Sequence, residues 1–114
     1  MHALSLLALL LPLVAANRHK QCDCMSWKSG EDWKHNEMLS YFVCWNDFKG
    51  QAKFNFDTKR CEALPGQSID GDTWEGHCKT AGLGYFPITM DGHMDASGTP
   101  LHVDAAAGSC PNRP

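Results

Sequence analysis

Apolar side chains recur at a helical period in the stretch before residue 50. The positions fall three or four residues apart and would share one face of a helix: Met38, Tyr41, Phe42, Trp45 and Phe48. Ser29-Gly30-Glu31-Asp32 supplies a capping serine and first-turn acids, and Gly50 is a typical helix end. The pattern therefore predicts a helix that starts at Ser29–Asp32, ends at Gly50 and turns its aromatic face, Trp45 included, into the core.

Two further elements follow in the pattern. Lys53-Phe54-Asn55-Phe56-Asp57 alternates polar and apolar residues, as a half-buried strand does, and Pro65-Gly66 marks a turn after it. The stretch from Asp70 to Thr80 predicts a second, short helix that carries Trp74 into the core. Gly82 is positioned to end that helix.

The C-terminal third loses this periodicity. Tyr85-Phe86-Pro87-Ile88 is compatible with an edge strand, because a proline cannot donate to a central ladder. Residues 91–109 are rich in Gly, Ala, Asp and Ser, so we expect a loop-rich segment tethered by Cys110, and then a loose tail at 111–114. The elements together predict an α+β fold: a small disulfide-rich single domain with one or two short helices and a small antiparallel sheet.

The first sixteen residues contain no Lys, Arg, Asp or Glu. An apolar segment from Leu4 to Val14 is followed by Ala15-Ala16, which is typical of a secretory signal peptide over residues 1–16. A membrane-spanning helix needs about 20 apolar residues, and the polar residues from Asn17 onward come too early for one. We therefore expect residues 17–114 to be secreted as an extracellular domain with no membrane span.

Charge narrows the class of partner. Ten Lys and Arg stand against thirteen Asp and Glu, for a net charge of −3. Nucleic-acid-binding and membrane-disrupting proteins favour basic surfaces. This charge balance thus predicts a protein that does not bind nucleic acid. We also expect the protein to be a monomer.

Cysteines provide the second constraint. An even number in a short exported chain predicts a disulfide framework, here formed by Cys22, Cys24, Cys44, Cys61, Cys78 and Cys110. Side chains two residues apart in an extended backbone share a face, and a bond between Cys22 and Cys24 would close a strained ring. We expect each of the two to reach a different downstream partner, and the other pairings stay open. Zinc spacings are missing.

Some histidines could serve catalysis. His77, His93 and His102 occur among carboxylates that a small secreted ribonuclease could use with them, together with an Arg: Glu75, Asp91, Asp95 and Asp104. Their spacing is equally typical of solvated loop histidines. Neither the Gly-x-Ser-x-Gly nor the His-Glu-x-x-His motif occurs, and oxidised cysteines offer no nucleophile. We therefore expect a non-enzymatic protein.

The four tryptophans suggest a binding surface. Trp27 and Trp33 are flanked by charged residues, which predicts that these two form an exposed pair. Exposed indole rings can stack on sugar rings, whereas buried ones add apolar area to a small core. A carbohydrate-binding face at Trp27 and Trp33 is one alternative.

The layout of the chain resembles that of small secreted cysteine-rich proteins of filamentous fungi. The resemblance lies in the leader, Cys22-x-Cys24 close behind it, six cysteines, and Ile69-Asp-Gly-x-x-Trp74-x-x-x-Cys78. It departs from several of those proteins in having no doubled Cys-Cys. Many of them are candidate effectors, which implies a binding protein that acts on an unknown host or cell-wall ligand. The alternatives are a carbohydrate-binding or antimicrobial, toxin-type protein and, third, a ribonuclease.

One metal site follows from the leader alone. Cleavage after Ala16 would leave Asn17, Arg18 and His19 at a free N-terminus. The terminal amine, two backbone amides and the imidazole can then surround Cu(II) or Ni(II) with four nitrogens in a plane, a geometry these ions prefer. We expect no other cofactor.

This site can be tested on the secreted protein. N-terminal sequencing is expected to begin at Asn17, and titration at pH 7.4 is expected to bind one equivalent of Cu(II). Cleavage one residue to either side displaces His19 from the third position, so any other N-terminal residue would refute the copper site.

Overall fold

The computed structural model describes residues 18–111, in which the strands and helices of four or more residues follow the order β-α-β-β-α-β. The six elements are β2 (Gln21–Trp27), α2 (Glu37–Asp47), β4 (Ala52–Asn55), β5 (Arg60–Ala63), α3 (Gly71–Ala81) and β7 (Ala105–Ser109). The strands pair antiparallel in the order β7-β2-β5-β4, so two split β-α-β units interlock. This architecture confirms the small disulfide-rich α+β domain.

Three strands of two residues complete the framework. β1 (Arg18–His19) pairs with β6 (Ile69–Asp70), and β3 (Lys34–His35) pairs with β2 on the side where β5 also lies. The predicted signal peptide and the last residues of the predicted tail lie outside the described range. No helix within residues 18–111 is long and apolar enough to cross a membrane.

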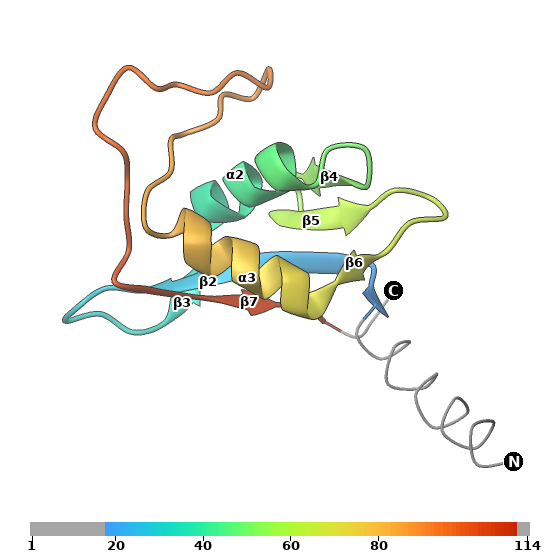
Figure 1. Ribbon diagram of the computed structural model, residues 1–114, viewed down its shortest axis with the longest axis horizontal. Coiled ribbons are helices and arrows are strands. Elements are labelled where there is room, and N and C mark those ends of the chain that lie inside the picture. The colour runs from blue at the N-terminus through green and yellow to red at the C-terminus, as the bar shows by residue number, and fades with distance from the viewer. Residues whose placement is uncertain (1–17, 112–114) are drawn as a thin grey trace, which may run out of the picture.

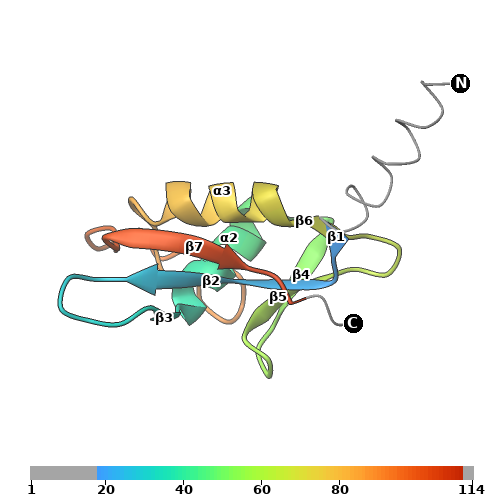
Figure 2. The same cartoon turned by 90° about the horizontal axis from the view of Figure 1, so that it is seen from below.

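Both helices pack on one face of the sheet (Figures 1 and 2). Cys24 of β2 is bonded to Cys78 of α3, and Cys44 of α2 is bonded to Cys61 of β5. Cys61 lies opposite Cys22 in the register, and Cys22 shares a face with Cys24 because they are two residues apart. The same sheet face therefore meets α2 and α3.

The disulfides confirm the expectation for Cys22 and Cys24. Cys22 pairs with Cys110, just beyond β7, while Cys24 pairs with Cys78. Both side chains have no exposed surface. The strand β2 is thereby cross-linked to the second helix and to the end of the chain.

The predicted start of the first helix is wrong. Residues 29–31 form a turn with Gly30 at φ 89°, and α2 begins at Glu37. Asn36 is the N-cap, because its side-chain oxygen accepts a hydrogen bond from the Leu39 N–H at 3.0 Å. An asparagine next to the periodic stretch is a closer cap than a serine seven residues upstream.

The buried face of α2 also differs from the predicted one. Leu39 and Val43 have no exposed surface, whereas Met38 is 43% exposed and Trp45 is only half-buried. The placement of Trp45 in the core is therefore wrong. Phe42 and Phe48 are buried as expected.

The second helix and the strand before it agree better with prediction. α3 has Asp70 as N-cap and Gly82 as C-cap, and Trp74 is fully buried. The predicted strand 53–57 ends earlier, at Asn55, because the Asn55 side chain accepts hydrogen bonds from the N–H groups of the next turn.

The expectation of loop throughout 91–109 is wrong at its end. Residues 105–109 form β7, which pairs with β2 along its whole length. The residues are small because α3 packs directly on them: a Cβ on Gly108 would lie 2.9 Å from both Glu75 Cα and Trp74 Cδ1. Tyr85–Ile88 contributes only isolated bridges, to Leu101 and Met94, and no strand.

Alanine substitutions at two glycines are expected to change the free energy of unfolding in opposite directions. Gly108→Ala is expected to lower the free energy of unfolding by about 1–3 kcal/mol, because the added methyl has no space. Gly76→Ala, in the exposed middle of α3 with nothing within 4 Å of the new Cβ, is expected to raise it by up to about 1 kcal/mol. Urea unfolding followed by circular dichroism measures both. Equal effects would contradict direct packing of α3 on β7.

Candidate functional site

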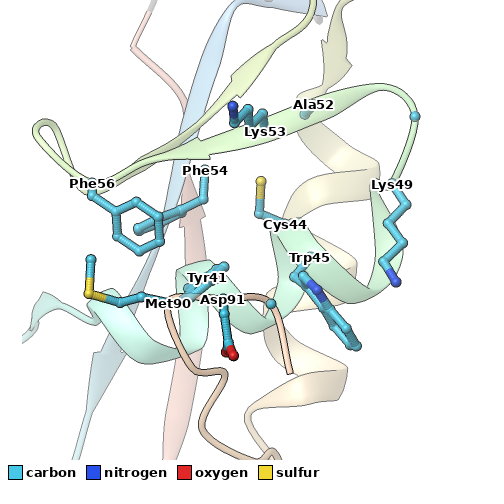
Figure 3. A pocket seen from close by; sticks show the side chains of 12 residues that line it. Tyr41, Cys44, Trp45, Lys49, Ala52, Lys53, Phe54, Phe56, Met90 and Asp91 are labelled. Atoms are coloured by element: carbon cyan, nitrogen blue, oxygen red, sulfur yellow. The ribbon is translucent and has the colours of Figure 1, made fainter. Parts of the chain in front are cut away.

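A cavity lined by aromatic rings lies between α2, β4 and the loop around residue 91 (Figure 3). Its volume is about 340 Å³. We call it the aromatic groove, and its main lining side chains are Tyr41, Trp45, Lys49, Lys53, Phe54, Phe56, Met90 and Asp91.

Three rings form its rigid floor. Tyr41 of α2 stacks on Phe54 of β4 with centroids 4.9 Å apart and planes 21° apart. Phe56 meets both rings edge-on at 5.1 Å. Phe54 is buried but Phe56 is 40% exposed, so the cluster joins the core to the surface. Such edge and stacked pairs add stability beyond the area they bury.

The loop of residues 89–93 forms the lower wall. The Tyr41 hydroxyl donates to the Thr89 carbonyl at 2.9 Å, which ties the loop to α2. Thr89 Oγ1 donates to Asp91 and accepts from the His93 N–H. This bonded turn presents Met90, 79% exposed, at the groove.

Charged groups lie around the apolar floor. Lys49 Nζ lies 4.0 Å from the centroid of the Trp45 ring, a cation–π contact at one end. Hydrogen bonds from Thr89 and then from His93 hold the pKa of Asp91 below its usual range, so Asp91 is ionised at neutral pH. Burial, and then the charge of Asp91, raises the pKa of Tyr41.

A second hollow of about 390 Å³ continues the groove toward the start of α2. Met38, Phe56 and Met90 line it. These are three of the seven large apolar side chains that are exposed within residues 18–111. Clustered exposed apolar side chains are typical of interaction sites, while single ones are not.

The predicted tryptophan pair lies elsewhere. Trp33 is 50% exposed and Trp27 is half-buried at the end of β2, and neither lines the aromatic groove. A binding face there stays a prediction. The sequence pattern does not reveal the groove, because Met38, Tyr41 and Trp45 are spaced like residues that face a core. Leu39 and Val43 form a neighbouring apolar stripe, and this second stripe is the sequence signal that a different face of the helix is buried.

The three histidines of the ribonuclease alternative are not brought together as a set. His77 Nδ1 lies 3.2 Å from Asp47 on α2, and His93 Nδ1 lies 3.3 Å from Asp91 in the groove loop. His102 is exposed near the end of the long C-terminal loop.

The carboxylates of that alternative have structural partners. Glu75 accepts from the Gly108 N–H at 3.2 Å and Asp104 accepts from the Ser29 N–H at 2.8 Å. Asp95 accepts from the Ser97 hydroxyl and N–H, which lower its pKa. The first contact joins α3 to β7, the second joins two loops, and the third lies within one loop.

The N-terminal copper site is only partly described. Asn17 lies outside the described residues, while Arg18 and His19 form β1. His19 Nδ1 is buried and has no hydrogen-bond partner. Within residues 18–111 no group of three His, Cys, Asp or Glu could hold a metal ion. Copper binding stays a prediction.

No family model matches the chain, and no curated protein or solved structure is significantly similar to it.

The electrostatic link between Asp91 and Tyr41 can be measured. Asp91→Asn is expected to lower the pKa of Tyr41 but leave it above 10.0, because burial is the larger cause. A raised phenol pKa stabilises the fold below pH 10 and loses that contribution as pH rises through the folded value, so the variant should unfold less steeply with alkali. NMR titration of the tyrosine ring resonances measures the pKa. Asp95→Asn is the control, and an equal shift there would contradict the assignment.

Proposed function

We propose that this chain is an exported binding protein of the effector-like kind, which recognises a protein partner outside the cell through the aromatic groove. One observation carries the proposal: exposed apolar side chains gather around a preformed aromatic cavity. The three disulfides are compatible with an oxidising extracellular location. The leader and the resemblance to fungal secreted proteins support the same location.

The chemistry of the groove favours an apolar peptide side chain over a sugar. Its floor is built from Tyr41, Phe54 and Phe56, and the Tyr41 hydroxyl is already engaged with the loop. Sugar hydroxyls would find few partners on that floor. An aromatic or aliphatic side chain would bury its area against the rings.

Charge adds a preference within the peptide. Lys49 and Lys53 border the cavity against the single carboxylate of Asp91. Neither lysine is joined to an acidic residue in the ion pairs found between residues 18 and 111. The groove thus has a locally positive rim in a chain of net charge −3. We expect acidic residues beside the apolar anchor.

The backbone of β4 offers a further attachment. β4 is the last strand of the sheet. The hydrogen bond from the Leu64 N–H to the Gln51 carbonyl fixes the alternation of the ladder, which directs the N–H and C=O of Phe54 away from β5. An extended peptide could bond this edge while alternate side chains enter the groove.

Selection of peptide ligands tests the proposal. A displayed peptide library is selected on the folded secreted domain, and the dissociation constants of synthetic copies are measured by calorimetry. Enriched peptides are expected to combine an apolar anchor with acidic neighbours. Phe56→Ser and Met90→Ser are each expected to weaken binding at least tenfold, about 1.4 kcal/mol.

Leu83→Ser is the matched control, since Leu83 is 80% exposed and lies outside the groove. It is expected to change affinity less than twofold. An equal loss in Leu83→Ser would refute the groove as the binding site. Binding of chitin or glucan oligosaccharides that depends on Phe56, with no peptide enriched, would replace this proposal by the carbohydrate-binding alternative.

A further inference from the structure

A second cavity lies at the opposite end of the first helix from Lys49. It has a volume of about 560 Å³. It shares Glu37 and Met38 with the hollow that continues the aromatic groove, but no lining residue with the cavity between α2 and β4. We call it the histidine pocket, and its lining residues include Ser26, Lys28, Lys34, His35, Tyr85 and His102. Residues from β2, β3 and the C-terminal loop meet there.

His35 is held by a buried carboxylate. Its Nδ1 lies 2.7 Å from Oδ2 of Asp23, whose side chain is only 3% exposed. An ionised carboxylate can only accept, so Nδ1 carries the proton and Nε2 is the nitrogen left for exchange with a ligand. Arg60 Nε lies 3.4 Å from the other Asp23 oxygen, an ion-pair contact that leaves this oxygen without a hydrogen bond within residues 18–111. The imidazole is therefore oriented as a general base is.

His102 provides a second imidazole to the same pocket. It is exposed, and no hydrogen bond or ion pair is found for its side chain within residues 18–111. Two histidines facing one cavity can divide the roles of general base and general acid. Two carboxylates also line the pocket: Glu31 pairs with Lys34 at 3.5 Å and Glu37 pairs with Lys59 at 3.5 Å. Lys28 is the lining ammonium outside the ion pairs found within residues 18–111, and it can stabilise negative charge on a phosphate.

The protein supplies no nucleophile to this pair. The hydroxyls of Ser26 and Tyr85 are engaged by the Asn36 amide, at 3.0 and 3.3 Å, and neither contacts a histidine. The cysteines are all bonded. The attacking group must come from water or from the substrate, and RNA carries one beside each phosphodiester, the 2′-hydroxyl.

We propose that the histidine pocket cleaves single-stranded RNA by transfer of the phosphoryl group to the 2′-oxygen. His35 Nε2 takes the proton of the 2′-hydroxyl, and the 2′-oxygen forms a bond to phosphorus. The bond from phosphorus to the 5′-oxygen breaks, and that oxygen takes a proton from the His102 imidazolium. The products are a 2′,3′-cyclic phosphate and a 5′-hydroxyl, so atoms and protons balance.

This activity goes beyond the proposed binding function and is independent of it. It also departs from the sequence expectation of a non-enzymatic protein without a nucleic-acid partner, which rested on the overall charge. A net charge of −3 predicts weak affinity for long nucleic acids. Turnover of short single strands would depend on individual groups in the pocket, Lys28 and the two histidines, because its lysines and glutamates balance in charge.

The test uses a short fluorophore–quencher oligoribonucleotide and the folded secreted domain. Wild-type protein is expected to cleave it with a bell-shaped pH dependence. His35→Gln and His102→Gln are each expected to lower the rate about 100-fold or more. Asp23→Asn acts through His35, the general base, so it is expected to displace the acidic limb of the pH profile and not to abolish cleavage.

Controls separate the pocket from other causes. His77→Gln and His93→Gln, on histidines outside the pocket, should keep the wild-type rate. The all-deoxy oligonucleotide should resist cleavage. The double variant His35→Gln/His102→Gln, purified in parallel and checked for folding by circular dichroism, measures contaminating nuclease. Wild-type cleavage no faster than that of the double variant, or cleavage of the all-deoxy strand, would overturn the proposal.

Discussion

The central strand β2 carries the constraint on which the rest of the fold depends. Its two cysteines face the helices and fix the strand to α3 and to the chain end. The Cys24 N–H donates to Ser40 Oγ of α2 at 2.7 Å, and the indole N–H of Trp74 donates to the Asp23 carbonyl at 2.9 Å. Because buried polar groups need partners, these contacts fix the position of both helices on one strand.

The opposite side of the same strand creates a different environment. Asp23 lies between Cys22 and Cys24 in sequence, so its side chain points away from the helix layer. Its carboxylate is held at the gap between β3 and β5, by His35 from one strand and Arg60 from the other. Burying a charge is costly unless it is paired. β2 therefore cross-links the core and also orients the imidazole of His35 through the buried carboxylate of Asp23.

Sequence reasoning succeeded where local rules and tertiary needs agree. α3 has an acidic cap, a buried tryptophan and a terminal glycine, all readable from the chain. Cys22 and Cys24 had to bond to different partners, because a bond between them would close a strained ring. Sequence reasoning failed for β7, since Ala-Ala-Ala-Gly-Ser has weak strand propensity and becomes a strand by pairing with β2. Its residues are small because α3 packs directly on Gly108.

The sites were harder to predict for related reasons. α2 has two apolar stripes, and periodicity alone does not say which one faces the core. In the structure Leu39 and Val43 face the core, so Tyr41 and Trp45 line the groove. His35 and His102 are far apart in sequence, and only the pairing of β2 with β3 and β7 brings their segments to one pocket.

The bond between Cys22 and Cys110 has a consequence for resistance to proteolysis. It encloses nearly all of the described chain in one covalent ring, with a sequence separation of 88. An exopeptidase trimming from either end meets this cross-link before it reaches a helix. A single endoproteolytic nick in the exposed stretch after residue 93 would open the ring and release no fragment. A protease can therefore cut the domain once in this stretch, and the strands still remain in one covalently linked molecule.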